Sequence, residues 1–273
     1  MRRTFATIII CLLTATAMGQ TAEIEVSYTA LSPNFKNGEV DVSNQYVLLA
    51  NAKESKFFSP ITDYIDSLNS TPEGAAKWRE MTRSAAMKGD FDNMPRKDGS
   101  YYIVKSAESN TIRYYDSAGL DEYYYEETPE DWSWEISDSI KTIMGYECVK
   151  ARTDFHGRKW SVWFSTDIPV SNGPWKFGGL PGLILEASSE DGKYSFFANG
   201  IQQTFKPIGP VYLAEKYEKT DRKNFLKAKR AFLDNPLGSI NAQFGGDIKI
   251  SENSGDQIFA SSDVVDLIET DYR

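Results

Sequence analysis

The sequence is poor in the residues on which many catalytic sites depend. Its 273 residues include one histidine, His156, and two cysteines, Cys11 and Cys148. A serine or cysteine nucleophile needs a base, so a single imidazole leaves little room for that chemistry. Neither a Gly-x-Ser-x-Gly motif nor a His-Glu-x-x-His motif occurs. We therefore assign no catalytic residue, no metal site and no cofactor from the sequence. A pair of carboxylates stays open as an alternative, because there are 39 acidic residues.

Long apolar runs and an excess of positive charge are also missing. The formal net charge is −9 and the isoelectric point is about 4.9, which argues against nucleic acid as a partner. The longest apolar run, within residues 8–13, is far shorter than the roughly 20 residues of a membrane-spanning helix. We therefore predict a protein that does not span a membrane. A hydrophobic content of 41% with 25% charged residues excludes a disordered chain.

The N-terminus has the features of an export signal. Two arginines precede the apolar run, and Ala17 and Gly19 provide the small residues of a signal-peptidase site. We predict that residues 1–19 are a signal peptide cleaved after Gly19. Residues 20–273 would then form a single β-rich domain in the periplasm or outside the cell.

Loss of the signal peptide would leave Cys148 as the only cysteine. A single thiol forms no internal disulfide, so the fold must depend on its core. The residues around Cys148 alternate in polarity and indicate a strand. We interpret Cys148 as a buried small hydrophobic residue, with a metal ligand or a redox thiol as the alternative.

Alternating apolar segments joined by glycine-containing turns predict a mainly β protein. The pair His156-Gly157 suits a two-residue turn with positive φ at both positions, and we expect His156 to be exposed at its tip. We predict a single curved antiparallel sheet or an open half-barrel, with two or more flanking helices. The predicted hairpins join residues 111–115 to 120–125, 143–155 to 158–164, and 183–188 to 193–199.

Two helices are predicted beside the sheet. Thr71 before Pro72 is typical of a helix start, and Lys88-Gly89 of its end. A second helix runs from Thr220-Asp221 to about Asp234. We interpret the basic face of the second helix as solvated, with anion or surface binding as the alternative. This face carries Arg222, Lys223, Lys227, Lys229 and Arg230.

The most distinctive segment is a glycine-rich motif in residues 171–185. Pro181-Gly182 predicts the centre of a type II turn, with positive φ at Gly182. The glycines lead into an apolar strand and not into a helix, so we exclude a phosphate-binding loop. We predict a structural turn with Trp175 and Phe177 packed nearby. The motif comprises Gly178, Gly179, Leu180, Pro181, Gly182, Leu183 and Ile184.

Residues 179–184 resemble the signature of the GLPGLI family. Residues 46–59 resemble the N-terminal block of that family, and residues 145–169, with Cys148, resemble the block before the signature. The resemblance implies an exported protein of Bacteroidota bacteria, in the cell envelope or secreted. It implies no biochemical activity. An analogy with periplasmic lipoprotein carriers implies a curved sheet.

An acidic, aromatic segment in residues 121–135 is the next notable feature. We favour a strand whose tyrosines cover the sheet, followed by a solvated acidic loop. The alternative is a sugar-binding platform or a cation site, although the spacing fits no calcium loop. The candidate ligand-binding residues are Trp132, Trp134, Trp175 and Phe177.

Two functional hypotheses follow from these observations. The first is a non-enzymatic envelope protein that binds an apolar ligand or an envelope partner on the concave face of its sheet. The second is a carbohydrate-binding module or a carboxylate-based glycoside hydrolase.

Overall fold

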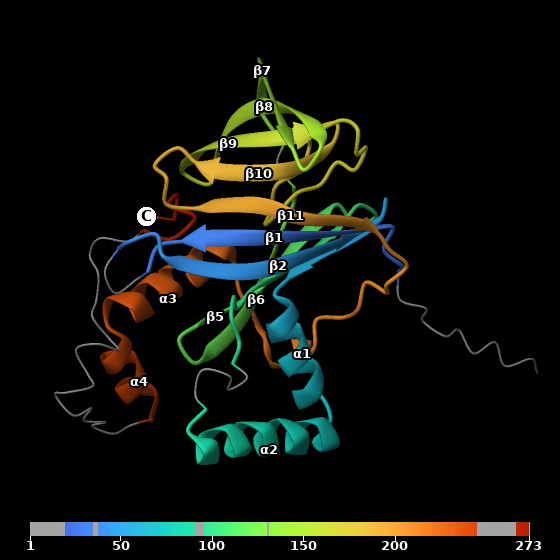
Figure 1. The fold of residues 1–273 in the computed structure, drawn as a ribbon. Coiled ribbons are helices and arrows are strands. Elements are labelled where there is room, and N and C mark those ends of the chain that lie inside the picture. The colour runs from blue at the N-terminus through green and yellow to red at the C-terminus, as the bar shows by residue number, and fades with distance from the viewer. Residues whose placement is uncertain (1–19, 35–37, 91–95, 130, 245–265, 273) are drawn as a thin grey trace, which may run out of the picture.

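The computed structural model describes residues 20–34, 38–90, 96–129, 131–244 and 266–272, and the predicted signal peptide lies outside them. Its strands form one 12-stranded sheet in the order β12-β6-β5-β4-β3-β2-β1-β11-β10-β9-β8-β7 (Figure 1). Neighbouring strands are antiparallel except β12 and β6. The strands are β1 (Ile24–Ser32), β2 (Val42–Ala50), β3 (Glu54–Phe58), β4 (Tyr102–Ser106), β5 (Thr111–Ala118), β6 (Asp121–Glu127), β7 (Glu135–Ile143), β8 (Tyr146–Phe155), β9 (Arg158–Ser165), β10 (Leu183–Ser189), β11 (Ser195–Gln203) and β12 (Glu218–Lys219). The prediction of a mainly β, mostly antiparallel open sheet is confirmed.

Two-residue turns set the register of several hairpins. His156 and Gly157 have φ of 50° and 80° between the paired residues Phe155 and Arg158, which confirms the predicted turn. The prediction of one strand over residues 143–155 is wrong. Met144 and Gly145 have φ of 51° and 89° and turn the chain between β7 and β8. Positive φ is uncommon for methionine, so the sequence carries little sign of this turn.

Four α-helices flank the sheet in the described part of the chain: α1 (Pro60–Asn69), α2 (Pro72–Lys88), α3 (Arg222–Asp234) and α4 (Pro236–Phe244). The predictions of α2 and α3 are confirmed. The Thr71 side chain accepts from the Gly74 N–H at 3.1 Å, and Gly89 closes α2 in the left-handed conformation. Asp221 caps α3 in the same way. Helices α1 and α4 were not predicted. None of these helices is long and apolar enough to cross a membrane.

Aromatic side chains make up much of the core between the sheet and α3. The rings of Tyr46, Tyr101, Tyr114 and Tyr125 stack in series across the sheet, with centroids 4.8, 5.6 and 5.0 Å apart. Phe225 of α3 packs on the last two of these rings. Cys148 of β8 is free and fully buried in the hydrophobic core of the sheet, as predicted.

Candidate functional site

A cavity of about 560 Å³ lies between the sheet and α3. Strands β1 and β2 contribute Ala30 and Tyr46 to its wall, and α3 contributes Leu226. Alternate residues of a strand face the same side of a sheet, so Val42, Asn44 and Tyr46 of β2 line the cavity together. We call this space the α3 cavity.

The walls of the α3 cavity are mainly aromatic and aliphatic. Tyr101, Tyr114 and Phe196 come from the sheet side, and Phe225 and Phe232 come from α3. A space of this size with such a lining is typical of small-molecule sites in proteins.

Charged side chains stand at one edge of the α3 cavity, and each has a partner. Lys229 of α3 forms an ion pair with Asp116, a fully buried residue of β5. The Ser100 hydroxyl also donates to Asp116. Arg230 pairs with Asp234. The interpretation of the basic face of α3 as solvated is therefore wrong for Lys229 and holds for Lys223, which is exposed.

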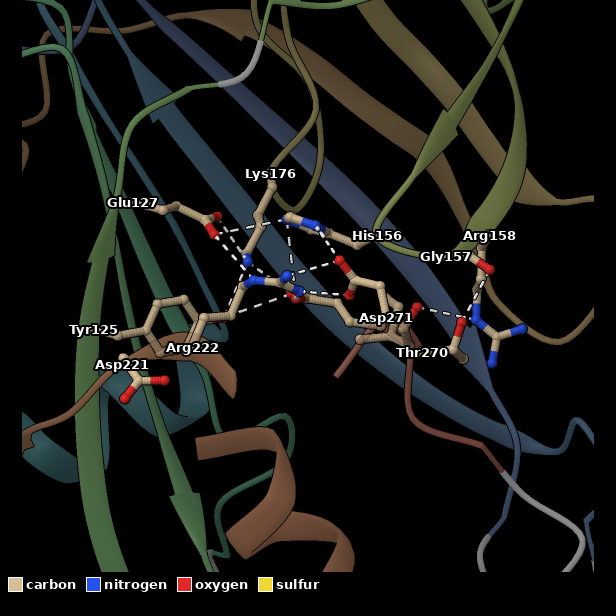
Figure 2. Close-up of polar contacts among 12 residues, drawn as sticks. Tyr125, Glu127, His156, Gly157, Arg158, Lys176, Asp221, Arg222, Thr270 and Asp271 are labelled. Carbon is tan, nitrogen blue, oxygen red and sulfur yellow. Dashed lines mark hydrogen bonds and ion pairs between the residues drawn. The ribbon is translucent and has the colours of Figure 1, made fainter. Parts of the chain in front are cut away.

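A largely buried group of titratable residues, which we call the ionic cluster, adjoins the α3 cavity through Glu269, which is part of the cavity lining. Polar contacts among these residues are drawn in Figure 2. The members are Glu127, His156, Lys176, Arg222, Glu269 and Asp271. The Lys176 ammonium is fully buried and lies 2.7 Å from carboxylate oxygens of both Glu127 and Glu269. It also donates to the Tyr125 hydroxyl at 2.9 Å. Burial alone raises the pKa of Glu127, but the Lys176 charge and hydrogen bonds from His156 and Lys176 outweigh it and lower that pKa to about 2.

The other side of the ionic cluster is held by Arg222, the first residue of α3. Its Nη1 lies 2.6 Å from Glu269 and 2.7 Å from Asp271. A second guanidinium nitrogen donates to Asp271, so this contact is bidentate. The basic face is therefore not solvated at Arg222 either.

The prediction that His156 is exposed is wrong, because the C-terminal residues cover the turn. His156 is 7% exposed, and its ring nitrogens lie 3.6 Å from Glu127 and 3.5 Å from Asp271. The Thr270 N–H donates to the His156 carbonyl at 2.9 Å, and the Thr270 hydroxyl donates to the Gly157 carbonyl (Figure 2).

Residues 266–272 connect the ionic cluster to the cavity, and we call them the C-terminal segment. The Arg158 guanidinium donates to the backbone carbonyls of Leu267 and Ile268. Leu267, Ile268 and Glu269 all line the α3 cavity. The ionic cluster therefore fixes one wall of the cavity, a connection that the sequence analysis missed.

Ligand atoms of His156, Glu269 and Asp271 lie within 4.8 Å of one another, a spacing that a metal ion can use. Arg222 already binds both carboxylates. A metal ion there would have to replace the guanidinium, so the residues fit a closed ionic cluster better than a metal centre.

The glycine-rich motif takes a different turn from the predicted one. Positive φ occurs at Gly179, at 79°, and not at Gly182. A type II turn centred on Pro181-Gly182 is therefore wrong. Gly182 is required for another reason, because a Cβ there would lie 2.0 Å from the carbonyl oxygen of Ser165. The motif leads into β10, whose Leu183 and Ile184 are fully buried, as is almost all of Leu180.

The predicted ligand-binding aromatics gather around the motif and away from the α3 cavity. Trp175 and Phe177 are fully buried and pack on Trp160, with ring centroids 5.7 and 4.9 Å away. Fully buried rings present no surface to a ligand in this conformation. Trp132 and Trp134 are half-buried and stack on each other at 5.1 Å.

The Trp132–Trp134 pair holds the motif in place. The Trp134 Nε1–H donates to the Gly178 carbonyl at 3.0 Å, and the Trp132 ring lies at the position that a Gly179 Cβ would occupy. Trp132 also packs on Phe155 at 4.4 Å. These contacts indicate a structural role for both tryptophans.

We expect alanine at both Trp132 and Trp134 to lower the free energy of unfolding by about 2 kcal/mol or more. The loss combines buried ring area with the hydrogen bond to Gly178. Thermal denaturation measures it, beside a glycan-binding panel. An unchanged melting temperature together with lost glycan binding would contradict the structural role and support a sugar platform.

The fold and the cavity define a mainly β protein with one open sheet and an apolar pocket beneath a helix. A family model described as a protein of unknown function (Porph_ging) matches residues 155–186. These residues run from the end of β8 to β10 and include the glycine-rich motif. No curated protein matches the chain.

Solved structures show the same fold. Structures of PNGF-II in the P21 and C2 space groups each superpose with a TM-score of 0.50 at 14% sequence identity. Each superposition covers 76% of this chain. This chain spans about a third of the length of PNGF-II, 33% in the P21 structure and 32% in the C2 structure. At this identity the likeness shows the fold alone.

Proposed function

We propose that this protein is an exported, non-enzymatic binding protein of the GLPGLI family that holds an apolar small molecule in the α3 cavity. The observation that carries the proposal is the cavity itself, about 560 Å³ in volume and lined by stacked tyrosines and by α3. The predicted signal peptide and the motif in residues 179–184 support export and the family assignment.

The lining of the α3 cavity favours an apolar ligand over a charged one. Lys229 and Arg230 are the cations at its edge, and both are neutralised by aspartates. A ligand that carried a charge would have to break one of these pairs. An apolar molecule would instead gain by leaving water, at about 25 cal/mol per Å² of buried surface.

We expect Asn44→Trp to weaken binding of an apolar probe by at least about tenfold. Asn44 is half-buried on the wall of the α3 cavity, so an indole ring there occupies the space of a ligand. N-phenyl-1-naphthylamine, whose fluorescence rises in apolar surroundings, is the probe.

Ser43→Trp is the matched control. Ser43 is the neighbouring residue of β2, is exposed and faces the other side of the sheet. The control variant is expected to bind the probe like the wild-type protein. Equal affinities of the two variants, or no binding by the wild type, would refute a ligand site in the α3 cavity. Native mass spectrometry of the gently purified protein then tests for a retained ligand, seen as an added mass.

A further inference from the structure

A second hollow, of about 320 Å³, lies at a different place on the sheet and shares no lining residue with the α3 cavity. The β2–β3 and β4–β5 turns form one side, and the glycine-rich motif with Trp132 forms the other. Its lining includes Ala107, Ile112 and Trp132, beside the polar residues Asn110 and Thr111. We call this hollow the motif cleft.

Lys105 of β4 is half-buried and lines the motif cleft, and its amine is the reactive group of this hollow. Its Nζ donates to the Phe177 carbonyl at 2.6 Å and to the Asn172 side-chain oxygen at 2.9 Å. Both acceptors are neutral. Within the described residues Lys105 forms no ion pair, although two carboxylates, Glu23 and Glu54, are also in the lining. The other charged residues of the lining are Lys53 and Lys176.

The surroundings of Lys105 suit a neutral amine. A neutral amine has two N–H donors and one lone pair, and the two donors match the two neutral acceptors. An ammonium has a third proton and a charge, which a carboxylate would normally balance. Burial of Lys105 lowers the pKa of its ammonium to about 7. A desolvated lysine of this kind is a nucleophile near neutral pH.

We propose that Lys105 is a nucleophilic amine and that the motif cleft takes a small aldehyde or ketone, which Lys105 holds as an imine. The Nζ lone pair attacks the carbonyl carbon, and the carbonyl oxygen takes up a proton from the nitrogen. The hydroxyl then leaves as water with the second N–H proton, the C–O bond breaks and the nitrogen lone pair forms the C=N bond; addition of water reverses the step. The reaction needs no oxidant or reductant. The site is independent of the α3 cavity, so either proposal stands if the other fails.

Reductive trapping tests the proposal on the intact protein. Propanal and sodium cyanoborohydride convert each imine into a stable alkylamine, and peptide mass mapping locates it. At about pH 7 we expect Lys105 to be alkylated at least about tenfold faster than Lys53, an exposed lysine at the same cleft. The rate at Lys105 should rise with pH and level off above about pH 7, because the neutral fraction of the amine does so.

Two controls keep the test decisive. The preference for Lys105 must disappear in guanidinium, where all lysines have ordinary pKa values. Lys105→Arg keeps two donors for Phe177 and Asn172 and removes the nucleophile, so that variant must fold and lose the fast label. If Lys105 of the native protein reacts no faster than Lys53 while the terminal amine is labelled, the proposal is wrong.

Discussion

Replacing Gly182 with alanine is expected to lower the free energy of unfolding by at least about 3 kcal/mol, or to prevent folding. Gly182 immediately precedes β10, whose Leu183 pairs with Ser165 of β9. An added Cβ would lie 2.0 Å from the Ser165 oxygen and 2.6 Å from its carbonyl carbon. Both atoms are backbone, so relief requires the two strands to move apart. Urea denaturation measures the effect.

Gly209→Ala is the matched control. A Cβ at Gly209 has no atom within 4 Å, and the φ angle there is not positive. We expect this variant to unfold within about 1 kcal/mol of the wild type, with slight stabilisation from the lower entropy of its unfolded chain. If Gly182→Ala unfolded at the same urea concentration as Gly209→Ala, the close approach of Gly182 to Ser165 would not affect the free energy of unfolding, and the prediction would be wrong.

Features of the fold that depend on residues adjacent in the sequence could be predicted from the sequence. A capping threonine, a proline and a closing glycine together determine α2, and the pair His156-Gly157 determines a turn. Helix α1 has the same type of start, with Ser59 before Pro60, so the beginning of this helix also follows from residues adjacent in the sequence. The turn at Met144 is different, because methionine gives no sign of positive φ.

Features that depend on tertiary contacts could not be predicted. The reason Gly182 must be glycine is the carbonyl of Ser165, which belongs to another strand. Lys176 and Lys105 look like ordinary surface lysines in the sequence, since lysine is mostly exposed in folded proteins. In the structure Lys176 is buried and Lys105 is half-buried. Only the fold shows that Lys176 meets two carboxylates and that Lys105 meets two neutral acceptors and, among the described residues, no carboxylate. The same holds for His156, because a distant segment covers its turn.

Lys176→Met is expected to lower the free energy of unfolding by about 3–5 kcal/mol. Methionine keeps much of the side-chain length but removes the charge that compensates Glu127 and Glu269. Glu269 is 1% exposed, so its carboxylate would lose a partner where water cannot replace it. Because Glu269 also lines the α3 cavity, probe binding should weaken together with stability. Lys219→Met is the control, since Lys219 pairs with Glu126 at the surface, and we expect no measurable change.

The pH dependence of stability separates the charge of Lys176 from its packing. In the folded protein the pKa of Glu127 is about 2, below its ordinary value of 4.5. The unfolded chain therefore takes up a proton first as the pH falls, and the stability that Glu127 contributes is complete above about pH 4.5 and lost on the way to about pH 2. In Lys176→Met, Glu127 loses the ammonium that contributes most to its low pKa. The loss of stability between about pH 4.5 and pH 2 should therefore be smaller in this variant than in the wild type. If the variant lost stability equally at every pH in this range, packing and not charge would explain the role of Lys176.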